Sequence, residues 1–255
     1  MRSSLGSYFL VLNIVLALFP AAALSEPLRG EVEHSETVPA APLSMMPGAK
    51  LDEEALPKLI PGNNWIAIPN WFAGTWQFKT EKVTRMRVFV KDKAYPPVPF
   101  TLRNEFQRAH GQQKDKSGQI WDYIKVPYSY TTKVNDGYLG YERIVSVEVP
   151  ICNDDEIIRK AFGPDSVVDP NSQEILLTQQ KQSVNRYTKF GDDAILLDSS
   201  TKIFDIQGSP TVLKISEMVG MRVKPYEEID EQDGRNLKEL FAQFLTSNGK
   251  KDLIP

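Results

Sequence analysis

From residue 63 to residue 224 the chain consists of short runs in which apolar and polar residues alternate. Val, Ile, Thr, Phe and Tyr are frequent in these runs, as they are in β-strands, and turn-forming triplets separate them, for example at 116–118, 135–137, 191–193 and 208–210. The predicted strands cover residues 72–81, 85–92, 100–108, 119–125, 128–134, 141–151, 174–188, 194–198 with 202–206, and 211–224.

Few helix-length patterns interrupt these runs, so we expect a mainly antiparallel sheet. Eight or nine strands joined by short turns favour a barrel or a sandwich, because both architectures limit exposed strand edges. The sequence therefore predicts a single mainly β domain over residues 63–255: an antiparallel barrel or sandwich of eight or nine strands, with a C-terminal amphipathic helix.

Two segments have the pattern of a helix. Residues 154–162 begin with acidic side chains and continue with apolar ones, which predicts a short crossover helix. Near the C-terminus, apolar residues recur at the i, i+3, i+4, i+7 spacing of an amphipathic helix, followed by Asn248-Gly249. They are Leu237, Leu240, Phe241, Phe244 and Leu245. We expect this second helix to pack on the outside of the sheet.

The predicted strand 174–188 is polar on both faces after Leu177. Gln179, Lys181, Ser183 and Asn185 share one face, while Gln180, Gln182 and Arg186 share the other. Such a strand either projects from the sheet as a ribbon or lines a polar interior, and the projecting ribbon is the simpler interpretation. In both cases we expect the first four side chains to form a ligand-binding or docking surface.

The N-terminal 62 residues differ from the domain. Residues 1–25 combine Arg2, an apolar stretch at 8–19 and a small-x-small pattern at 23–25, which predicts an export signal and a mature chain beginning near Glu26. Residues 26–62 are rich in proline and acidic residues and lack aromatic ones. We expect this segment to be a flexible leader. The alternative is that a short apolar stretch such as 43–46 docks on the domain or on a partner.

Composition excludes several classes of function. The formal net charge is −3 and there is no Lys/Arg-rich block, so neither nucleic acid nor an anionic membrane is an expected partner. One Cys and two His rule out an intrachain disulfide and a Cys/His zinc site, and no cofactor is predicted. No segment after the export signal is apolar enough for a membrane span. Cys152 is expected to be a buried thiol.

Candidate catalytic groups are few. His110 lies in a polar stretch, 108–118, that is typical of a hairpin tip, and its pairing with Cys152 would need a coincidence of the fold. The acidic clusters 154–156 and 192–193 suit a helix start and a tight turn better than a metal site. No catalytic or metal-binding residue is therefore predicted.

Gly74-Thr75-Trp76 opens the first long strand, and Arg222 lies in the last one. This arrangement resembles that of lipocalins and other calycin barrels, in which the tryptophan closes one barrel end against an arginine from the last strand. The resemblance implies a barrel over roughly residues 63–246 with Gly74, Trp76 and Arg222 at its closed end. The family's Thr-Asp-Tyr element is absent, and Gln77 replaces the usual aromatic residue.

Three functions remain open. The preferred one is an exported, non-enzymatic β-barrel that binds a small or amphipathic ligand, as the resemblance implies. The second is an envelope or extracellular protein that docks on another protein through the polar strand and the leader. The third, a hydrolase that uses carboxylates, is disfavoured because no base and orienting group can be assigned.

Overall fold

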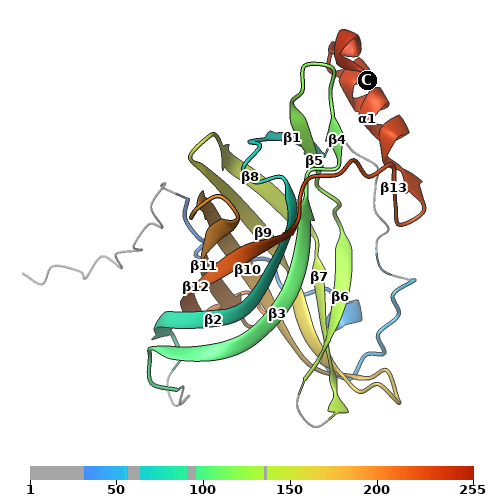
Figure 1. The fold of residues 1–255 in the computed structure, drawn as a ribbon. Coiled ribbons are helices and arrows are strands. Elements are labelled where there is room, and N and C mark those ends of the chain that lie inside the picture. The colour runs from blue at the N-terminus through green and yellow to red at the C-terminus, as the bar shows by residue number, and fades with distance from the viewer. Residues whose placement is uncertain (1–31, 55, 57–63, 91–95, 135–136) are drawn as a thin grey trace, which may run out of the picture.

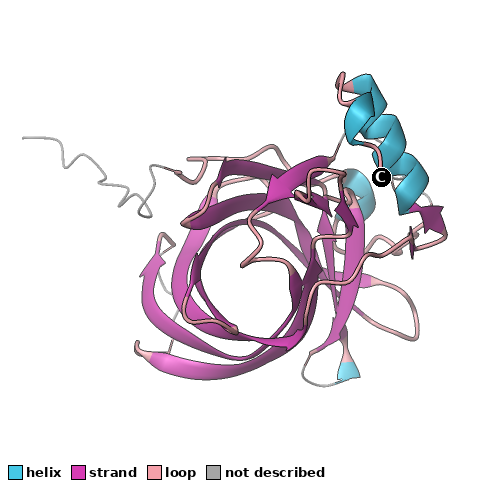
Figure 2. Cartoon of the chain, turned by 45° about the horizontal axis from the view of Figure 1, so that its top comes forward, coloured by secondary structure: helices cyan, strands magenta, loops and turns pink. Residues whose placement is uncertain are grey.

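The computed structural model describes residues 32–54, 56, 64–90, 96–134 and 137–255. Its main feature is a nine-stranded antiparallel sheet with the order β3-β2-β12-β11-β10-β9-β7-β6, in which β8 also pairs with β9. Figure 1 shows that this sheet curls, and in Figure 2 its strands surround a central axis. The predicted mainly β fold is confirmed, as an antiparallel half-barrel that is compatible with a calycin-like fold.

The strands of this sheet are β2 (Gly74–Val88), β3 (Phe100–His110), β6 (Tyr128–Lys133), β7 (Leu139–Ile144), β8 (Ser146–Cys152), β9 (Glu156–Val168), β10 (Ile175–Lys189), β11 (Ala194–Phe204) and β12 (Pro210–Lys224). Two predicted runs, 72–81 and 85–92, merge into β2, and the run 141–151 is divided between β7 and β8. The export signal expected at 1–25, and the start of the leader up to residue 31, lie outside the described residues.

The helix predicted at residues 154–162 is wrong, because this segment begins β9. Ile157 and Ile158, adjacent in sequence, are both fully buried, as happens when a strand is covered on both faces. The acidic start is a turn, since the side-chain oxygen of Asn153 accepts hydrogen bonds from the backbone N–H groups of Asp155 and Glu156. Long pairing with β10 outweighs the local helical pattern.

The projecting ribbon is also wrong for β10. This strand pairs with β9 along one side and with β11 along the other, so it lies in the middle of the sheet. Residues paired across strands share a face, and Tyr187 is paired with Leu197 and Ile157 in the apolar core. Gln179, Lys181, Ser183 and Asn185 alternate with the outward positions and therefore share the inner face with Tyr187.

The N-terminal segment covers the outer face of the sheet, which favours the docked alternative for the leader. The amide oxygen of Gln182 accepts hydrogen bonds from the ring of His34 (3.2 Å) and the backbone N–H of Ser35 (2.7 Å). Gln180 donates to the carbonyl of Pro39, and Met45 is only 1% exposed. The outward amides of β10 are thus satisfied by the leader's polar groups.

A second, smaller core lies beside the half-barrel, where helix α1 (Leu237–Ser247) covers a three-stranded sheet in the order β1-β5-β4. The strands are β1 (Trp65–Ile68), β4 (Gln113–Lys114) and β5 (Ile120–Tyr123), and Figure 1 shows them next to the helix. Phe241 lies 4.8 Å from the ring of Trp65 and 5.8 Å from that of Trp121. The C-terminal helix is therefore confirmed, and its apolar side packs on this small sheet. A short hairpin, formed by β13 (Glu231–Gln232) and β14 (Arg235–Asn236), directly precedes helix α1.

We predict that Gln182→Ala releases the leader. The substitution removes the acceptor shared by His34 and Ser35 and also the donor to the Ser35 hydroxyl, a loss of about 1–3 kcal/mol at a buried polar site. Thermolysin should then cut between residues 32 and 54 about tenfold faster than in the unaltered protein. Mass spectrometry of timed digests measures the rate. Gln179→Ala, on the inner face of the same strand, is the matched control and should leave the rate unchanged. If the leader of the unaltered protein is cut as fast as that of Gln182→Ala, the leader is not held by Gln182. That result would support the flexible leader that the composition predicts.

Candidate functional site

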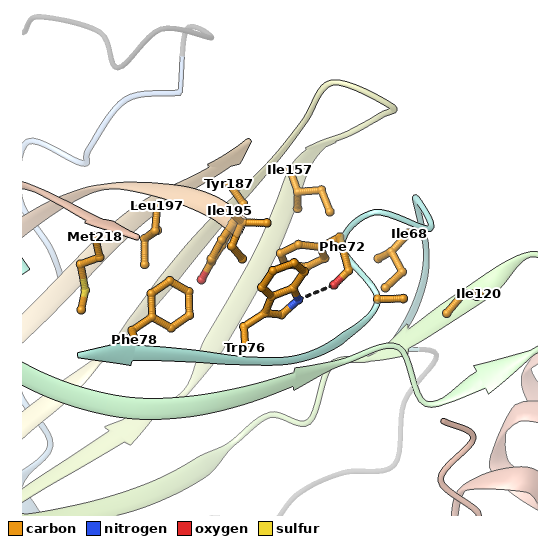
Figure 3. Packing of buried hydrophobic residues seen from close by; sticks show 11 residues of the cluster. Ile68, Phe72, Trp76, Phe78, Ile120, Ile157, Tyr187, Ile195, Leu197 and Met218 are labelled. Atoms are coloured by element: carbon orange, nitrogen blue, oxygen red, sulfur yellow. Dashed lines mark hydrogen bonds between the residues drawn. The ribbon is translucent and has the colours of Figure 1, made fainter. Parts of the chain in front are cut away.

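One end of the half-barrel interior is closed by tightly packed apolar side chains, shown in Figure 3. Trp76 and Phe78 from β2 are fully buried and lie with Tyr187, Leu197 and Met218, none of which exceeds 4% exposure. The indole N–H of Trp76 donates to the carbonyl of Phe72 at 2.8 Å, so the ring's polar atom is satisfied. This end is a packed core without room for a ligand.

The structure brings Gly74, Trp76 and Arg222 together at this closed end. Arg222 pairs with Trp76 across β12 and β2, and its guanidinium lies 4.4 Å from the centroid of the indole ring. It also donates to the backbone carbonyls of Ala73 and Trp71. Gly74 has a φ of +123°, and a Cβ there would lie 2.8 Å from the carbonyl oxygen of Lys224, so a side chain would displace the neighbouring strand.

A charged cluster lies beside the packed end. His110 is 2% exposed and stacks on Phe72 at 4.1 Å, and its Nδ1 lies 3.7 Å from a carboxylate oxygen of Asp122. Asp122 accepts from the guanidinium of Arg159 and from the backbone N–H of Gly111. Burial and the nearby guanidinium of Arg159 lower the pKa of His110 to about 4, so the imidazole is neutral at pH 7. The predicted hairpin stretch 108–118 contains the turn between β4 and β5, at residues 115–119, but His110 precedes that turn and its ring lies in the core.

Cys152 is half-buried, and its thiol contacts the carbonyl oxygen of Ala67 at 3.1 Å. Burial raises the pKa of the thiol above its ordinary value, so the sulfur is protonated at neutral pH. A protonated thiol whose hydrogen bond goes to a backbone carbonyl is not an activated nucleophile.

The other half of the interior is polar and keeps accessible surface. Lys181 contacts the carboxylates of Asp165 (2.9 Å) and Glu142 (3.2 Å), and Lys214 contacts that of Glu81 (2.6 Å). The side chains of Lys181, Asp165, Glu142 and Lys214 are 24%, 19%, 15% and 27% exposed, although each points to the inner face. These four side chains therefore form an accessible part of the inner face, on the polar side of the packed end.

The remaining predicted binding residues belong to the same polar lining. Gln179 donates to the carboxylate of Asp165 at 2.7 Å, and Asn185 accepts from the hydroxyl of Ser199 at 2.8 Å. The hydroxyl of Ser183 lies 3.4 Å from that of Thr201. All four predicted side chains are thus brought to one surface, but each is already held by a neighbouring strand.

Sequence reasoning missed Arg108, Tyr128 and Tyr130. Arg108 pairs with Trp76 and so faces inward from β3, and Tyr130 pairs with Glu142 and faces inward from β6. The two tyrosines stack on each other with their centroids 6.4 Å apart. Their i, i+2 spacing could have shown that they share a face, but only the topology reveals that β3 and β6 lie at the two ends of the curled sheet.

The acidic clusters at 154–156 and 192–193 have structural partners. The backbone carbonyl of Asp154 accepts from the indole of Trp71, Glu156 pairs with Arg186, and Asp193 lies 3.3 Å from the guanidinium of Arg222. Within the part of the chain that the structure describes, no group of three or more His, Cys, Asp and Glu side chains is placed to hold a metal ion. No helix among the described residues is long and apolar enough to cross a membrane.

Comparison with known proteins gives no relative for this chain: no family model, no curated protein and no solved structure matches it. The function must therefore be argued from the half-barrel and the side chains on its inner face.

We predict that Arg222→Ala lowers the free energy of unfolding by about 2 kcal/mol or more. The loss combines the stacking on Trp76 with two backbone carbonyls left without their donors. Arg222→Lys should recover less than half of it, because an ammonium cannot stack as a planar group. Urea unfolding followed by tryptophan fluorescence measures the change. The control is Arg103→Ala, whose side chain is 87% exposed and which should shift stability by less than about 0.5 kcal/mol. Equal effects of the two alanine variants would contradict the stacking role.

We also predict that stability falls as the pH drops from about 6.5 to about 4. Burial, with Lys202 and Lys160 nearby, lowers the pKa of His34 to about 4, and His110 behaves alike. Over this window the unfolded chain binds protons that the folded protein does not, so each ring destabilises the fold by on the order of 3 kcal/mol at the acid end. His34→Asn should remove about half of the decline caused by the two rings, measured by urea unfolding at several pH values. If the free energy of unfolding of His34→Asn falls with pH as steeply as that of the unaltered protein, His34 is not buried as a neutral ring.

Proposed function

We propose that this protein is a non-enzymatic binding protein of lipocalin-like design that takes a small or amphipathic ligand into its half-barrel. The observation that carries the proposal is the contrast between the two halves of the interior. Trp76 and its neighbours are fully packed at one end, whereas four inward-facing charged side chains of the other half, Lys181, Asp165, Glu142 and Lys214, keep 15% to 27% of their surface. An eight- or nine-stranded barrel of this kind has room for one small molecule.

The chemistry of the described residues supports binding over catalysis. The imidazole of His110 stacks on Phe72. The thiol of Cys152 is protonated and donates a hydrogen bond to the backbone carbonyl of Ala67. The inward-facing carboxylates Glu142, Asp165 and Glu81 are each paired with a lysine. For Glu81 burial opposes ionisation, but the hydrogen bond and charge of Lys214 keep the pKa of this carboxyl below its ordinary value, whereas a general acid needs a raised one. The export predicted from residues 1–25 would place such a binding protein outside the cytoplasm.

A row of apolar side chains on the outer face favours a second candidate function, docking on another protein. Val219, Met221 and Val223 alternate along β12 and are 41%, 52% and 42% exposed. Exposed apolar surface of this kind is typical of contact sites between proteins. The interior remains the preferred site. Its polar side chains are held in place by ion pairs, although they add nothing to an apolar core.

The proposal predicts that a bulky side chain inside the half-barrel blocks binding. Ser183 faces inward between Ala161 and Thr201, so Ser183→Phe fills the polar half. N-phenyl-1-naphthylamine, an uncharged apolar probe, should bind the unaltered protein saturably, and the variant should bind it at least about tenfold more weakly. Fluorescence titration gives both affinities, and circular dichroism checks the fold.

The matched control is Glu217→Phe, which adds the same ring on the exposed outer face of the same sheet. This variant should bind the probe as the unaltered protein does. Absence of saturable binding by the unaltered protein, or equal binding by the Ser183 and Glu217 variants, would overturn the proposed function.

A further inference from the structure

Strand β3 is an edge of the nine-stranded sheet, and its first half is uncovered. The strand pairs with β2 along one side, and no described strand pairs with its other side. Residues 101–105 are all exposed, so neither the leader nor helix α1 shields this half of the strand. In Figure 1 the start of β3 lies well apart from β6, the strand at the other end of the sheet order. The backbone N–H and C=O groups along this edge are therefore accessible to a further strand.

The β3 edge lacks the two residue types that most often protect a free strand edge. Lysine and proline are typical of protected edges, and residues 100–110 contain neither. The edge strand at the other end of the order, β6, is only six residues long and ends at Lys133. Strand β3 is eleven residues long. Of the two edges, that of β3 is therefore the better suited to pair with another chain.

The charged side chains of this half have opposite signs and a spacing that suits a second copy of the chain. Arg103 and Glu105 share one face of β3, are 87% and 40% exposed, and contact each other at 2.9 Å. When two identical strands pair antiparallel about a two-fold axis at Asn104, residue 103 of one copy lies opposite residue 105 of the other. Two ion pairs then cross the junction in place of the contact within each strand. A register shifted by two residues would set Arg103 opposite Arg103 or Glu105 opposite Glu105, and like charges repel.

The other face of the strand favours the same register with apolar side chains. Leu102 is 41% exposed, and Phe106 is half-buried against Phe78, with the two ring centroids 4.8 Å apart. About the axis at Asn104, Leu102 of one copy lies opposite Phe106 of the other, so two apolar cross-strand pairs form on this face. Cross-strand pairs of both kinds contribute about 0.2–1 kcal/mol each. Both faces of β3 are therefore complementary to a second β3 in one register.

We propose that the β3 edge is a self-association surface, on which a second copy of this chain pairs antiparallel about Asn104 through its own β3. The contact is isologous, so it closes at a dimer. A strand pair of this length buries less surface than a standard interface, and we expect a dissociation constant on the order of 10–100 µM. The monomer therefore predominates at the low concentrations of fluorescence experiments, where Arg103 does not meet a second copy. This inference goes beyond the proposed function and needs no ligand.

Sedimentation velocity of the full-length protein, from about 1 to about 300 µM, tests the proposal. The unaltered protein should shift from monomer to dimer across this range. Glu105→Arg sets like charges opposite each other at both ion pairs and should weaken the dimer at least about tenfold. Arg103→Glu and Glu105→Arg in one chain exchange the two charges, so each again lies opposite its complement and the dimer should return. The control is Glu217→Arg, an equal charge reversal on the exposed outer face of β12, which should leave the dissociation constant unchanged.

A mixture of the two single variants tests the register itself. Arg103→Glu has only negative charges at the ion-pair positions and Glu105→Arg has only positive ones, so neither should pair with itself. An equimolar mixture should form a heterodimer at least as stable as the unaltered dimer, and circular dichroism of each variant checks the fold. A monomer at every concentration of the unaltered protein would overturn the proposal. A dimer that Glu105→Arg does not weaken, or a mixture that stays monomeric, would do the same, because neither result is compatible with pairing about Asn104.

Discussion

The pairing of β12 with β2 is the constraint on which the rest of the structure depends. It returns the last long strand to the first and sets Arg222 opposite Trp76, so that one guanidinium covers the indole and satisfies two carbonyls of the chain that enters the domain. This pairing gives the half-barrel one closed end, which is filled by packed apolar side chains. It also helps to fix which face of the later strands is the inner one, because the registers of β12, β11, β10 and β9 are regular except for shifts at Ile203/Phe204 and Ile175/Leu177.

The interior then changes character along the strands. Near Trp76 it is an ordinary core, and beyond Tyr187 it is a surface of amides, hydroxyls and ion pairs. A folded protein gains little from burying such polar groups, since each hydrogen bond formed inside replaces one made to water. Their retention on the inner face of a central strand is therefore understandable for a protein that binds something there. On the outer face of the same strand, the side-chain amides of Gln180 and Gln182 are also satisfied, because they form hydrogen bonds with the leader.

Much of the fold could be predicted from the sequence, because strand alternation and the heptad-like spacing of the C-terminal helix are local signals. The run 154–162 was misleading because its acidic start and two consecutive isoleucines suit a helix locally, and only pairing with β10 decides for a strand. The docking of the leader depends on outward amides about 140 residues away in sequence, as for Gln180 and Pro39, which no local pattern reveals. In the candidate site, Gln179 to Asn185 could be found from alternation, whereas only the strand order shows that Arg108 and Tyr128 lie on the two edge strands of one curled sheet.

The curled sheet has an unusual seam. Among the described strands, β3 and β6 are the two ends of the order and do not pair with each other. Inward-facing side chains such as Arg108 on β3 and Tyr128 on β6 line these two edges, and no ladder of backbone hydrogen bonds joins the two strands. A ladder has fixed spacing, but rotamers adjust at little cost. Among the described strands, the width of the half-barrel between β3 and β6 is therefore not fixed by backbone pairing.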